Sequence, residues 1–565
     1  MSKRVLLILC FIAVASCTAP FSLDSSLPRE ATPMGGNLQS PILQYPKGTM
    51  PPTSTPFQPV AWTVTPAPPT ATPSPTPPPY SIWIDPNLPA GLRNRLSIPA
   101  EFGPSDQRET ATLRLEVGEA NPVSQWVYAL VAPFPTVADG VSVQDLHNAW
   151  NGDAGDTFGG RPLLVDESTR DAFASLWGSP SAGAVRVVAA GDALQAAWDQ
   201  PPAYALVPFE NLDPQWKVME VDGISPVRVD FDLGDYELVI PISLAGEAPI
   251  IPTIPATNRD PNKLTTVVMT GVTALVRATA FTMEQRGITY PAQDIGGWLR
   301  EADITHISNE VPFAEDCPYP NPVQPGMRFC SAARYIGLLE DVGTDIVELT
   351  GDHFSDWGAE ALLYTLELYA ERGWLYYGGG ADLQAGRQAV LVEHNGNRLA
   401  FIGCNAKGGG YAQASSSNPG AVACDFDWMQ AEIERLRGEG YLPIATFQHF
   451  EYYTYAAMPN QQRDARKLTE AGAVIVSGSQ AHHPQAFEFS NGGFVHHGLG
   501  NLFFDQLDVS EGTRQAFIDR HVFYNGKHIS TELLTIYFVD YARPRPMTAE
   551  ERAALLGAVF AASGW

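Results

Sequence analysis

Short apolar runs alternate with amphipathic segments through the second half of the chain. Runs of apolar and β-branched residues at 265–270, 399–403, 442–447 and 473–477 predict strands. Helices are predicted at 361–372, at 461–471 and around an apolar face of Met429, Ile433 and Leu436, and each of these segments runs into a glycine. This alternation predicts an α/β domain with a largely buried sheet.

The region before it, 81–250, predicts a smaller α/β domain. β-like runs occur at 112–117 and 126–131, and "VSVQDLHNAWNG" predicts a helix that ends at Gly152. The order of these elements resembles part of a type 2 periplasmic solute-binding domain, in which such strands frame a ligand cleft. The alternative is a structural module that positions the second domain.

The N-terminus is typical of an exported lipoprotein. Lys3 and Arg4 precede the apolar run 5–14, and Ala-Ser-Cys follows, so residues 1–16 are predicted as a signal peptide and Cys17 as the lipidated residue. Residues 17–80 are rich in Pro, Thr and Ser and predict an extended tether. We therefore expect a protein anchored by lipid to the outer face of a bacterial cell membrane. The alternative is plain secretion, with Cys17 incidental.

The remaining boundaries follow from composition. Residues 251–263 predict a linker, 264–510 the informative α/β domain, and 511–565 a C-terminal strand and helix extension of that domain. The formal net charge of −27 over 565 residues excludes nucleic acid as a partner.

Four cysteines remain after the signal peptide and Cys17. In an exported protein this even number predicts disulfides. The simplest of the three pairings joins Cys317 to Cys330 and Cys404 to Cys424. A zinc site is the weaker alternative, because neither pair has the tight spacing of a zinc knuckle.

Polar residues gather directly after the predicted strands. Glu310 follows "DITHIS", Asp352 and His353 follow "DIVELTG", His449 follows "LPIATFQ", and Gln480 and His482 follow "AVIVSGS". Ligands of open α/β sheets bind at the carboxyl ends of the strands. The pattern therefore predicts one edge that carries carboxylates, imidazoles and amides, as a metal or phosphoryl site requires.

Several motifs carry a family resemblance across about 240 residues. They are "TGVTALVR" at 270–277, "SNE" ending at Glu310, "GDHFSDWG" at 351–358, "QHFEYY" at 448–453, "GSQAH" at 478–482 and "GLGNLFFD" at 498–505. In this order they resemble the CapA family of capsule-synthesis and poly-γ-glutamate biosynthesis proteins. The resemblance implies a calcineurin-like metallophosphatase fold, a layered α/β sandwich with helices packed on β-sheets.

The resemblance also implies a metal site, which this sequence alters. Val272 stands where the family has a metal-ligating aspartate, and Gln480 replaces the first histidine of the His-x-His pair. The remaining candidate ligands for one divalent ion (Mn, Zn, Fe or Mg) are Glu310, Asp352, His449 and His482. The alternative is that no metal binds, because valine has no lone pair and glutamine is a poor ligand for a transition metal.

Other residues near the predicted metal site are expected to transfer protons or to position its ligands. His353 and His449 are the candidates for proton transfer, although His353 could equally serve the structure alone. Glu451 is expected to orient His449, and Asn501 to fix a tight loop with a contact to the site second. His483 is expected to point away from the cleft.

These features predict a cell-surface protein that makes or handles capsular polysaccharide or poly-γ-glutamate. If the cleft is catalytic, the expected reaction is metal-assisted hydrolysis of a phosphoester. The partners would be the polymer or its precursor, the membrane through the lipid, and subunits of a membrane synthase. The alternatives are a non-catalytic lipoprotein that binds a polymer or solute, and a scaffold for the synthase; Val272 and Gln480 favour these.

Overall fold

The computed structural model describes residues 78–565. The predicted signal peptide, Cys17 and nearly all of the predicted tether lie outside the described residues. None of the helices within 78–565 is both long enough and apolar enough to cross a bilayer.

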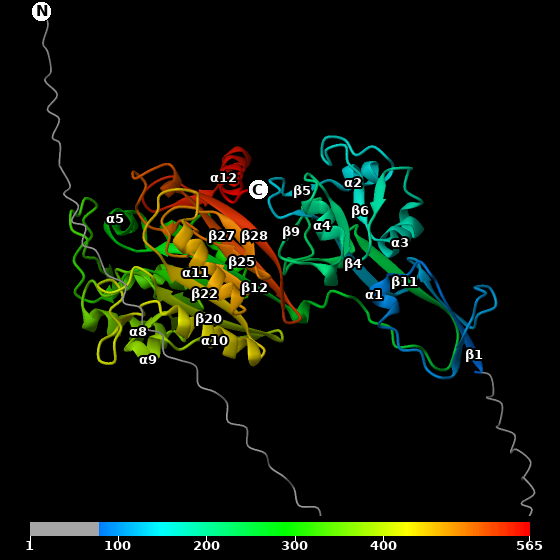
Figure 1. Cartoon of the computed structure of the whole chain (residues 1–565), viewed down its shortest axis with the longest axis horizontal. Helices are drawn as coiled ribbons and strands as arrows, with labels where there is room; N and C mark the ends of the chain where they lie inside the picture. The colour runs from blue at the N-terminus through cyan, green and yellow to red at the C-terminus, as the bar shows by residue number, and fades with distance from the viewer. Residues whose placement is uncertain (1–77) are drawn as a thin grey trace, which may run out of the picture. The chain divides into compact units, whose positions relative to one another are not determined.

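The first domain is built on a mixed sheet with strand order β2-β1-β3-β11-β4-β8-β6-β7, to which β9 adds beside β4. Its strands are β1 (Tyr80–Ile84), β2 (Phe102–Pro104), β3 (Leu113–Val117), β4 (Pro122–Pro133), β6 (Leu163–Val165), β7 (Val185–Val187), β8 (Ala205–Pro208), β9 (Trp216–Val218) and β11 (Val239–Gly246). Its helices are α1 (Ala90–Arg93), α2 (Val143–Trp150), α3 (Glu167–Trp177) and α4 (Ala193–Trp198). The helices lie beside this sheet (Figure 1). Sheet and helices share one buried core that includes Trp126, Trp150 and Phe173.

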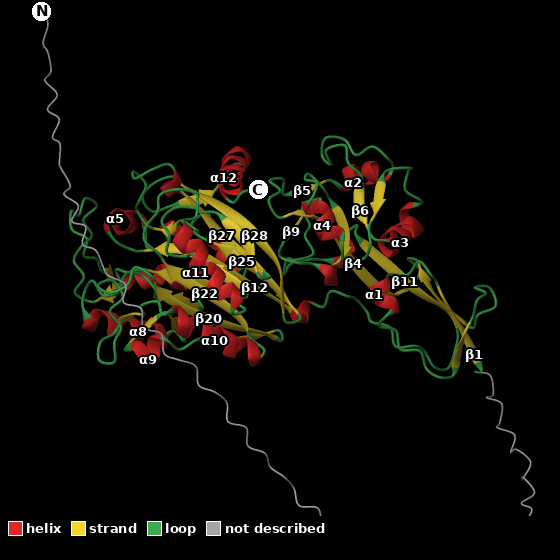
Figure 2. Ribbon diagram, in the orientation of Figure 1, coloured by secondary structure: helices red, strands yellow, loops and turns green. Residues whose placement is uncertain are grey.

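The second domain contains two sheets (Figure 2). The larger has the order β17-β16-β13-β12-β27-β28-β29, with β26 beside β12. Its strands are β12 (Leu264–Thr273), β13 (Ile304–Asn309), β16 (Ile346–Glu348), β17 (Leu375–Tyr377), β26 (Asn501–Phe503), β27 (Gln515–Tyr524), β28 (Lys527–Phe538) and β29 (Pro544–Pro546). Strands β12, β13, β16 and β17 run parallel, so their carboxyl ends share one edge.

The other sheet has the order β19-β20-β22-β23-β25-β24. Its strands are β19 (Val390–His394), β20 (Asn397–Asn405), β22 (Leu442–Gln448), β23 (Ile475–Ser477), β24 (Phe487–Ser490) and β25 (Gly493–His496). Strands β20, β22, β23 and β25 are parallel. The strands and helices predicted in this half of the chain are present, within a few residues at each end.

Helices cover the outer face of each sheet. They are α5 (Arg277–Arg286), α6 (Gly296–Arg300), α7 (Ile336–Asp341), α8 (Ala359–Glu371), α9 (Leu383–Gly386), α10 (Phe426–Gly438) and α11 (Pro459–Glu470). Helix α12 (Ala549–Ala562) packs instead with the core between the two sheets. Helix α8 ends where the sequence predicts, because Gly373 takes the left-handed conformation (φ 71°) that glycine adopts without strain.

Alternation along the strands builds three apolar layers. On β12, Val267 and Met269 face the other sheet, whereas Val268 packs with residues of α7 and α8. On β22, Ile444 faces the larger sheet and Ala445 packs against α10 and α11. Successive strand residues point to opposite faces, so each sheet is buried on both sides. The result is a helix–sheet–sheet–helix sandwich, which confirms the fold class expected from the resemblance.

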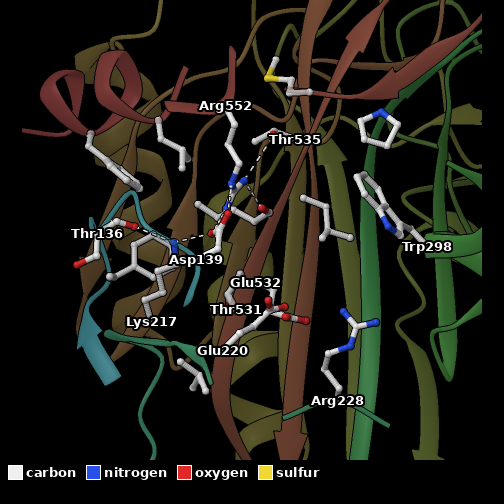
Figure 3. A pocket seen from close by; sticks show the side chains of 18 residues that line it. Thr136, Asp139, Lys217, Glu220, Arg228, Trp298, Thr531, Glu532, Thr535 and Arg552 are labelled. Carbon is white, nitrogen blue, oxygen red and sulfur yellow. Dashed lines mark hydrogen bonds and ion pairs between the residues drawn. The ribbon is translucent and has the colours of Figure 1, made fainter. Parts of the chain in front are cut away.

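The two domains meet at a cavity between β9 and β28 (Figure 3). Lys217 lies in it and donates to Asp139 at 2.8 Å, and Arg552 of α12 donates to the same carboxylate at 2.7 Å. Burial lowers the pKa of Lys217 to about 8, although Asp139 opposes this shift. The cavity therefore holds a compact charge network that links β9 to α12.

Both disulfides join the pairs that the spacing favours. Cys317 bonds Cys330, and Cys404 bonds Cys424 across 20 residues of chain. We expect the double variant Cys404→Ala/Cys424→Ala to lose about 3 kcal/mol of unfolding free energy, because a loop of this length no longer restricts the unfolded chain. Denaturant titration under non-reducing conditions measures the loss. A loss below about 1 kcal/mol would contradict the expected role of the bond.

Candidate functional site

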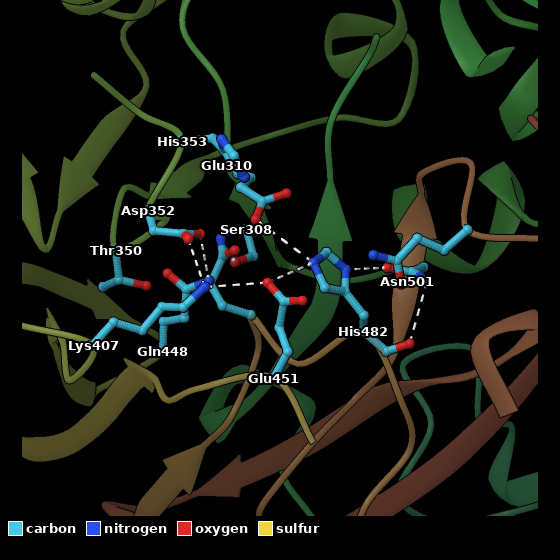
Figure 4. Close-up of polar contacts among 12 residues, drawn as sticks. Ser308, Glu310, Thr350, Asp352, His353, Lys407, Gln448, Glu451, His482 and Asn501 are labelled. Atoms are coloured by element: carbon cyan, nitrogen blue, oxygen red, sulfur yellow. Dashed lines mark hydrogen bonds and ion pairs between the residues drawn. The ribbon is translucent and has the colours of Figure 1, made fainter. Parts of the chain in front are cut away.

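The polar residues of the candidate site lie on loops that follow the parallel strands of both sheets. From the larger sheet, Glu310 follows β13, and Asp352 and His353 lie beyond β16. From the other sheet, Lys407 follows β20, Glu451 follows β22 and His482 follows β23. Contacts between these two groups of loops place the site where both sheets end (Figure 4).

Lys407 links two of the carboxylates. Its Nζ donates to Asp352 Oδ2 at 2.5 Å and to Glu451 Oε1 at 3.1 Å. Burial would lower the pKa of Lys407, but Asp352 and Glu451 outweigh it and raise that pKa. Gln448 Nε2 donates to the other oxygen of Asp352 at 2.8 Å, so both oxygens of this carboxylate are occupied.

The carboxylate of Glu310, unlike that of Asp352, is not hydrogen-bonded within residues 78–565. Its side chain is fully buried, and neither carboxylate oxygen has a hydrogen-bond partner among the described residues. The imidazole Nε2 of His482 lies 3.7 Å from Glu310 Oε1. Burial raises the pKa of Glu310 to about 7. A buried carboxylate without a partner is costly, so this side chain is suited to pairing with a bound cation.

His353 completes a group around Glu310. Ligand atoms of Glu310, Asp352 and His353 all lie within 4.8 Å of one another. His353 Nδ1 contacts Asp356 Oδ2 at 2.7 Å, which leaves Nε2 as the free donor atom. Burial opposes its charge, but the hydrogen bond to Asp356 and the charge of Glu310 outweigh burial and raise the pKa of His353 to about 9.

His482 is held in place by Asn501. Its Nδ1 lies 2.8 Å from Asn501 Oδ1, and the ring stacks on Phe504, so Nε2 faces Glu310 and Glu451. Asn501 thus fixes both the loop and the imidazole. The neighbouring His483 is buried away from the cleft against Tyr455, with centroids 4.8 Å apart.

The structure places His449 apart from this group. Its Nε2 lies 3.3 Å from Asp464 of α11, and burial lowers the pKa of His449 to about 4. Within residues 78–565, no hydrogen bond or ion pair joins it to Glu310 or Asp352. Glu451, which was expected to orient His449, contacts Lys407 and Tyr453 instead.

The two altered positions supply neither a carboxylate nor an imidazole, although Gln480 Oε1 is buried without a hydrogen-bond partner among the described residues. Val272 is fully buried on β12, in register with Ser308 and Asn501. Gln480 is 1% exposed, and its Nε2 donates to Ser308 Oγ at 2.7 Å. Both side chains serve the packing between strand ends.

The donor set fits one divalent ion. The unpartnered carboxylate of Glu310, one oxygen of Asp352 and the free Nε2 of His353 supply the mixed oxygen and nitrogen ligands that such ions accept. These donors do not select a particular metal. In the part of the chain that the structure describes, Val272 and Gln480 leave no comparable set for a second ion.

Lys407 was missed by the sequence reasoning. The signal was present, because "FIGCNAK" is an apolar run followed by a lysine, the same strand-end pattern that identified the other residues. A search for metal ligands passes over a cationic side chain, since an ammonium group has no lone pair to offer.

Comparisons with known proteins show what the second domain is similar to. Residues 266–506 match the model of the bacterial capsule synthesis protein PGA_cap. The capsule biosynthesis protein CapA of Bacillus anthracis is 23% identical over 302 residues, which are 52% of this chain and 72% of that protein. The PGA biosynthesis protein CapA of Bacillus subtilis (strain 168) is 24% identical over 193 residues, 34% of this chain and 50% of that protein.

Solved structures give weaker matches. A 5'-nucleotidase precursor from Thermus thermophilus matches with a TM-score of 0.30 and 12% identity over 52% of this chain and 58% of that one. An ABC-type phosphate transport receptor from Vibrio cholerae matches with a TM-score of 0.22 and 14% identity over 25% of this chain and 70% of that one. Scores this low carry no argument about function.

The second domain is thus a four-layer α/β sandwich that carries acidic and imidazole groups at the strand ends of both sheets. Residues 266–506 are similar to the bacterial capsule synthesis protein family, which includes CapA proteins of two Bacillus species.

Proposed function

We propose that this chain is an exported, lipid-anchored protein that makes or handles a polymer of the bacterial surface, capsular polysaccharide or poly-γ-glutamate. The observation that carries the proposal is the strand-end cluster of Glu310, Asp352, Lys407 and His482 inside the region that matches the family. The relatives from two Bacillus species are named for capsule and PGA biosynthesis.

Exposed aromatic side chains beside the cluster suit a polymer. Tyr411, Phe450 and Tyr453 are 42%, 48% and 43% exposed. Lys407 Nζ lies 5.1 Å from the centre of the Tyr411 ring, and Tyr453 donates to Glu451 at 2.9 Å. Flat apolar rings next to a polar cleft can pack against successive units of a chain while the charged groups contact one of them.

The chemistry that fits the cleft is attack on a phosphoester. A divalent ion held by Glu310, Asp352 and His353 would supply Lewis acidity toward a phosphoryl oxygen. Without an ion, His353 carries a proton at neutral pH, since its pKa is about 9, so Nε2 must release that proton to bind the ion. Asp356 holds the ring of His353 for this task.

Deletion of the gene in its own bacterium tests the proposal. We expect cell-associated polymer, measured as glutamate and sugar in acid hydrolysates, to fall at least several-fold and to return with the wild-type chain. A Cys17→Ala chain should appear in the medium and restore less polymer. Unchanged polymer in the deletion strain would refute the role in biosynthesis.

A non-catalytic binding role is the second candidate. Val272 and Gln480 favour it, because valine has no lone pair and glutamine is a poor ligand for a transition metal. The purified chain would be tested for metal content and for hydrolysis of a generic phosphodiester. Hydrolysis that depends on added metal favours the enzyme, and polymer binding without hydrolysis favours the binding protein.

A further inference from the structure

The ammonium group of Lys407 lies within the candidate metal site. Its side chain is 8% exposed, although lysine is rarely buried unless it is paired. Two carboxylates from different loops meet at its Nζ, Asp352 at 2.5 Å and Glu451 at 3.1 Å (Figure 4). The loops come from opposite sheets, so this cation joins the two halves of the cleft.

The carboxylates at the two ends of the cluster differ in their hydrogen bonding. At one end, Asp352 accepts from Lys407 and Gln448 with separate oxygens, and Glu451 accepts from Lys407 and Tyr453. At the other end, Glu310 has no partner for either oxygen among the described residues. Buried carboxylates need a cation or hydrogen-bond donors, so the chain's own lysine serves one end and an added cation suits the other.

We infer that Lys407 replaces one metal ion of a two-cation site, as a covalently attached cation between Asp352 and Glu451. The cleft then takes at most one exchangeable divalent ion, beside Glu310. This inference rests on the proposed metal site and is independent of the polymer.

The replacement also defines what the cleft can bind. An ammonium group has three protons, and the described residues give partners to two of them. The third suits an oxyanion of the ligand, phosphoryl or carboxylate, as lysine commonly binds such groups. The net charge of the chain is −27, so a local cation of this kind is what lets an anionic ligand approach.

The test is Mn²⁺ binding to the purified full-length chain, by calorimetry and by metal content after gel filtration. The wild-type chain is expected to bind at most one ion. Lys407→Met keeps the length of the side chain but leaves Asp352 and Glu451 without a cation, so it should bind one ion more. Lys407→Arg keeps the charge and should bind the same number as the wild-type chain.

Lys217→Met is the matched control, because Lys217 is also a buried lysine paired with an aspartate, outside the cleft. It should leave Mn²⁺ stoichiometry unchanged. If Lys407→Met purifies poorly, thermal unfolding of Lys407→Gln gives the same test, with a larger rise in Tm on Mn²⁺ addition than in the wild-type chain. Two ions on the wild-type chain, or equal stoichiometry in the Met and Arg variants, would overturn the inference. Neither result would alter the polymer phenotype of the deletion strain, so the two proposals fail separately.

Discussion

Replacing Arg277 with glutamine is expected to lower the free energy of unfolding by about 3–5 kcal/mol. The guanidinium donates from Nε and Nη2 to Asp505, whose side chain is only 4% exposed. Removing the arginine leaves a buried carboxylate with the backbone N–H of Ala278 as its remaining donor. Most of the loss comes from that uncompensated charge.

The same arginine supports both imidazoles of the cleft. It lies over Phe329 and Phe504, at 5.1 and 5.0 Å from the ring centres. Phe329 packs on His353 at 4.9 Å and Phe504 on His482 at 5.1 Å. We therefore expect Arg277→Gln to weaken Mn²⁺ binding at least tenfold as well, because His353 loses its fixed position.

Denaturant titration and calorimetry measure these two effects. Arg334→Gln is the control, since Arg334 forms an exposed ion pair with Glu284. Such pairs contribute about 0–1 kcal/mol, and this one lies outside the cleft. Similar losses in the two variants would show that Arg277 has no special role.

Replacing Glu310 with glutamine is expected to stabilise the metal-free protein while it abolishes metal binding. The folded protein holds the Glu310 proton up to a pKa of about 7, whereas the unfolded chain releases it at the ordinary value near 4.5. Stability therefore falls as pH rises between these values. At pH 8 the penalty is complete, at about 3 kcal/mol, and the Glu310→Gln variant avoids it.

Glu348→Gln is the matched control for this prediction. Glu348 is also fully buried, but it accepts hydrogen bonds from Thr350 and Ser479. Burial raises the pKa of Glu348 too, but these hydrogen bonds oppose the shift, so Glu348→Gln should stabilise the protein at pH 8 much less than Glu310→Gln does. Two measurements test this prediction. One is the free energy of unfolding at pH 8 in the absence of metal, and the other is Mn²⁺ binding by calorimetry. A Glu310→Gln variant that is less stable than the wild-type chain, or that binds Mn²⁺ normally, would contradict the assignment.

Local sequence patterns were enough to predict the main strands and helices of the second domain. The run 442–447 became β22 and the run 265–270 became β12, because strands buried on both faces show as short apolar segments. The loops that follow the parallel strands carry Glu310, Asp352 and His482, and the shared direction of those strands brings these three to one edge.

The direction of each side chain on those loops was not predictable from local patterns. His449 turns to Asp464 because α11 packs beside its loop, whereas His353 is turned into the site by Asp356 and Phe329. Arg277 takes a left-handed backbone (φ 44°), where a non-glycine residue needs outside support, and Asp505 lies 228 residues away.

The sequence by itself therefore determined the class of the fold and the loops that carry the site, and it favoured the disulfide pairs that the structure shows, since strand periodicity and short-range spacing are local properties. The tertiary structure alone decided which residues meet. Lys407 joins Asp352 and Glu451 across two sheets, and Glu310 is left without a partner among the described residues. Charge pairing in a buried site depends on distances between segments far apart in the chain, and only the packed structure sets those distances.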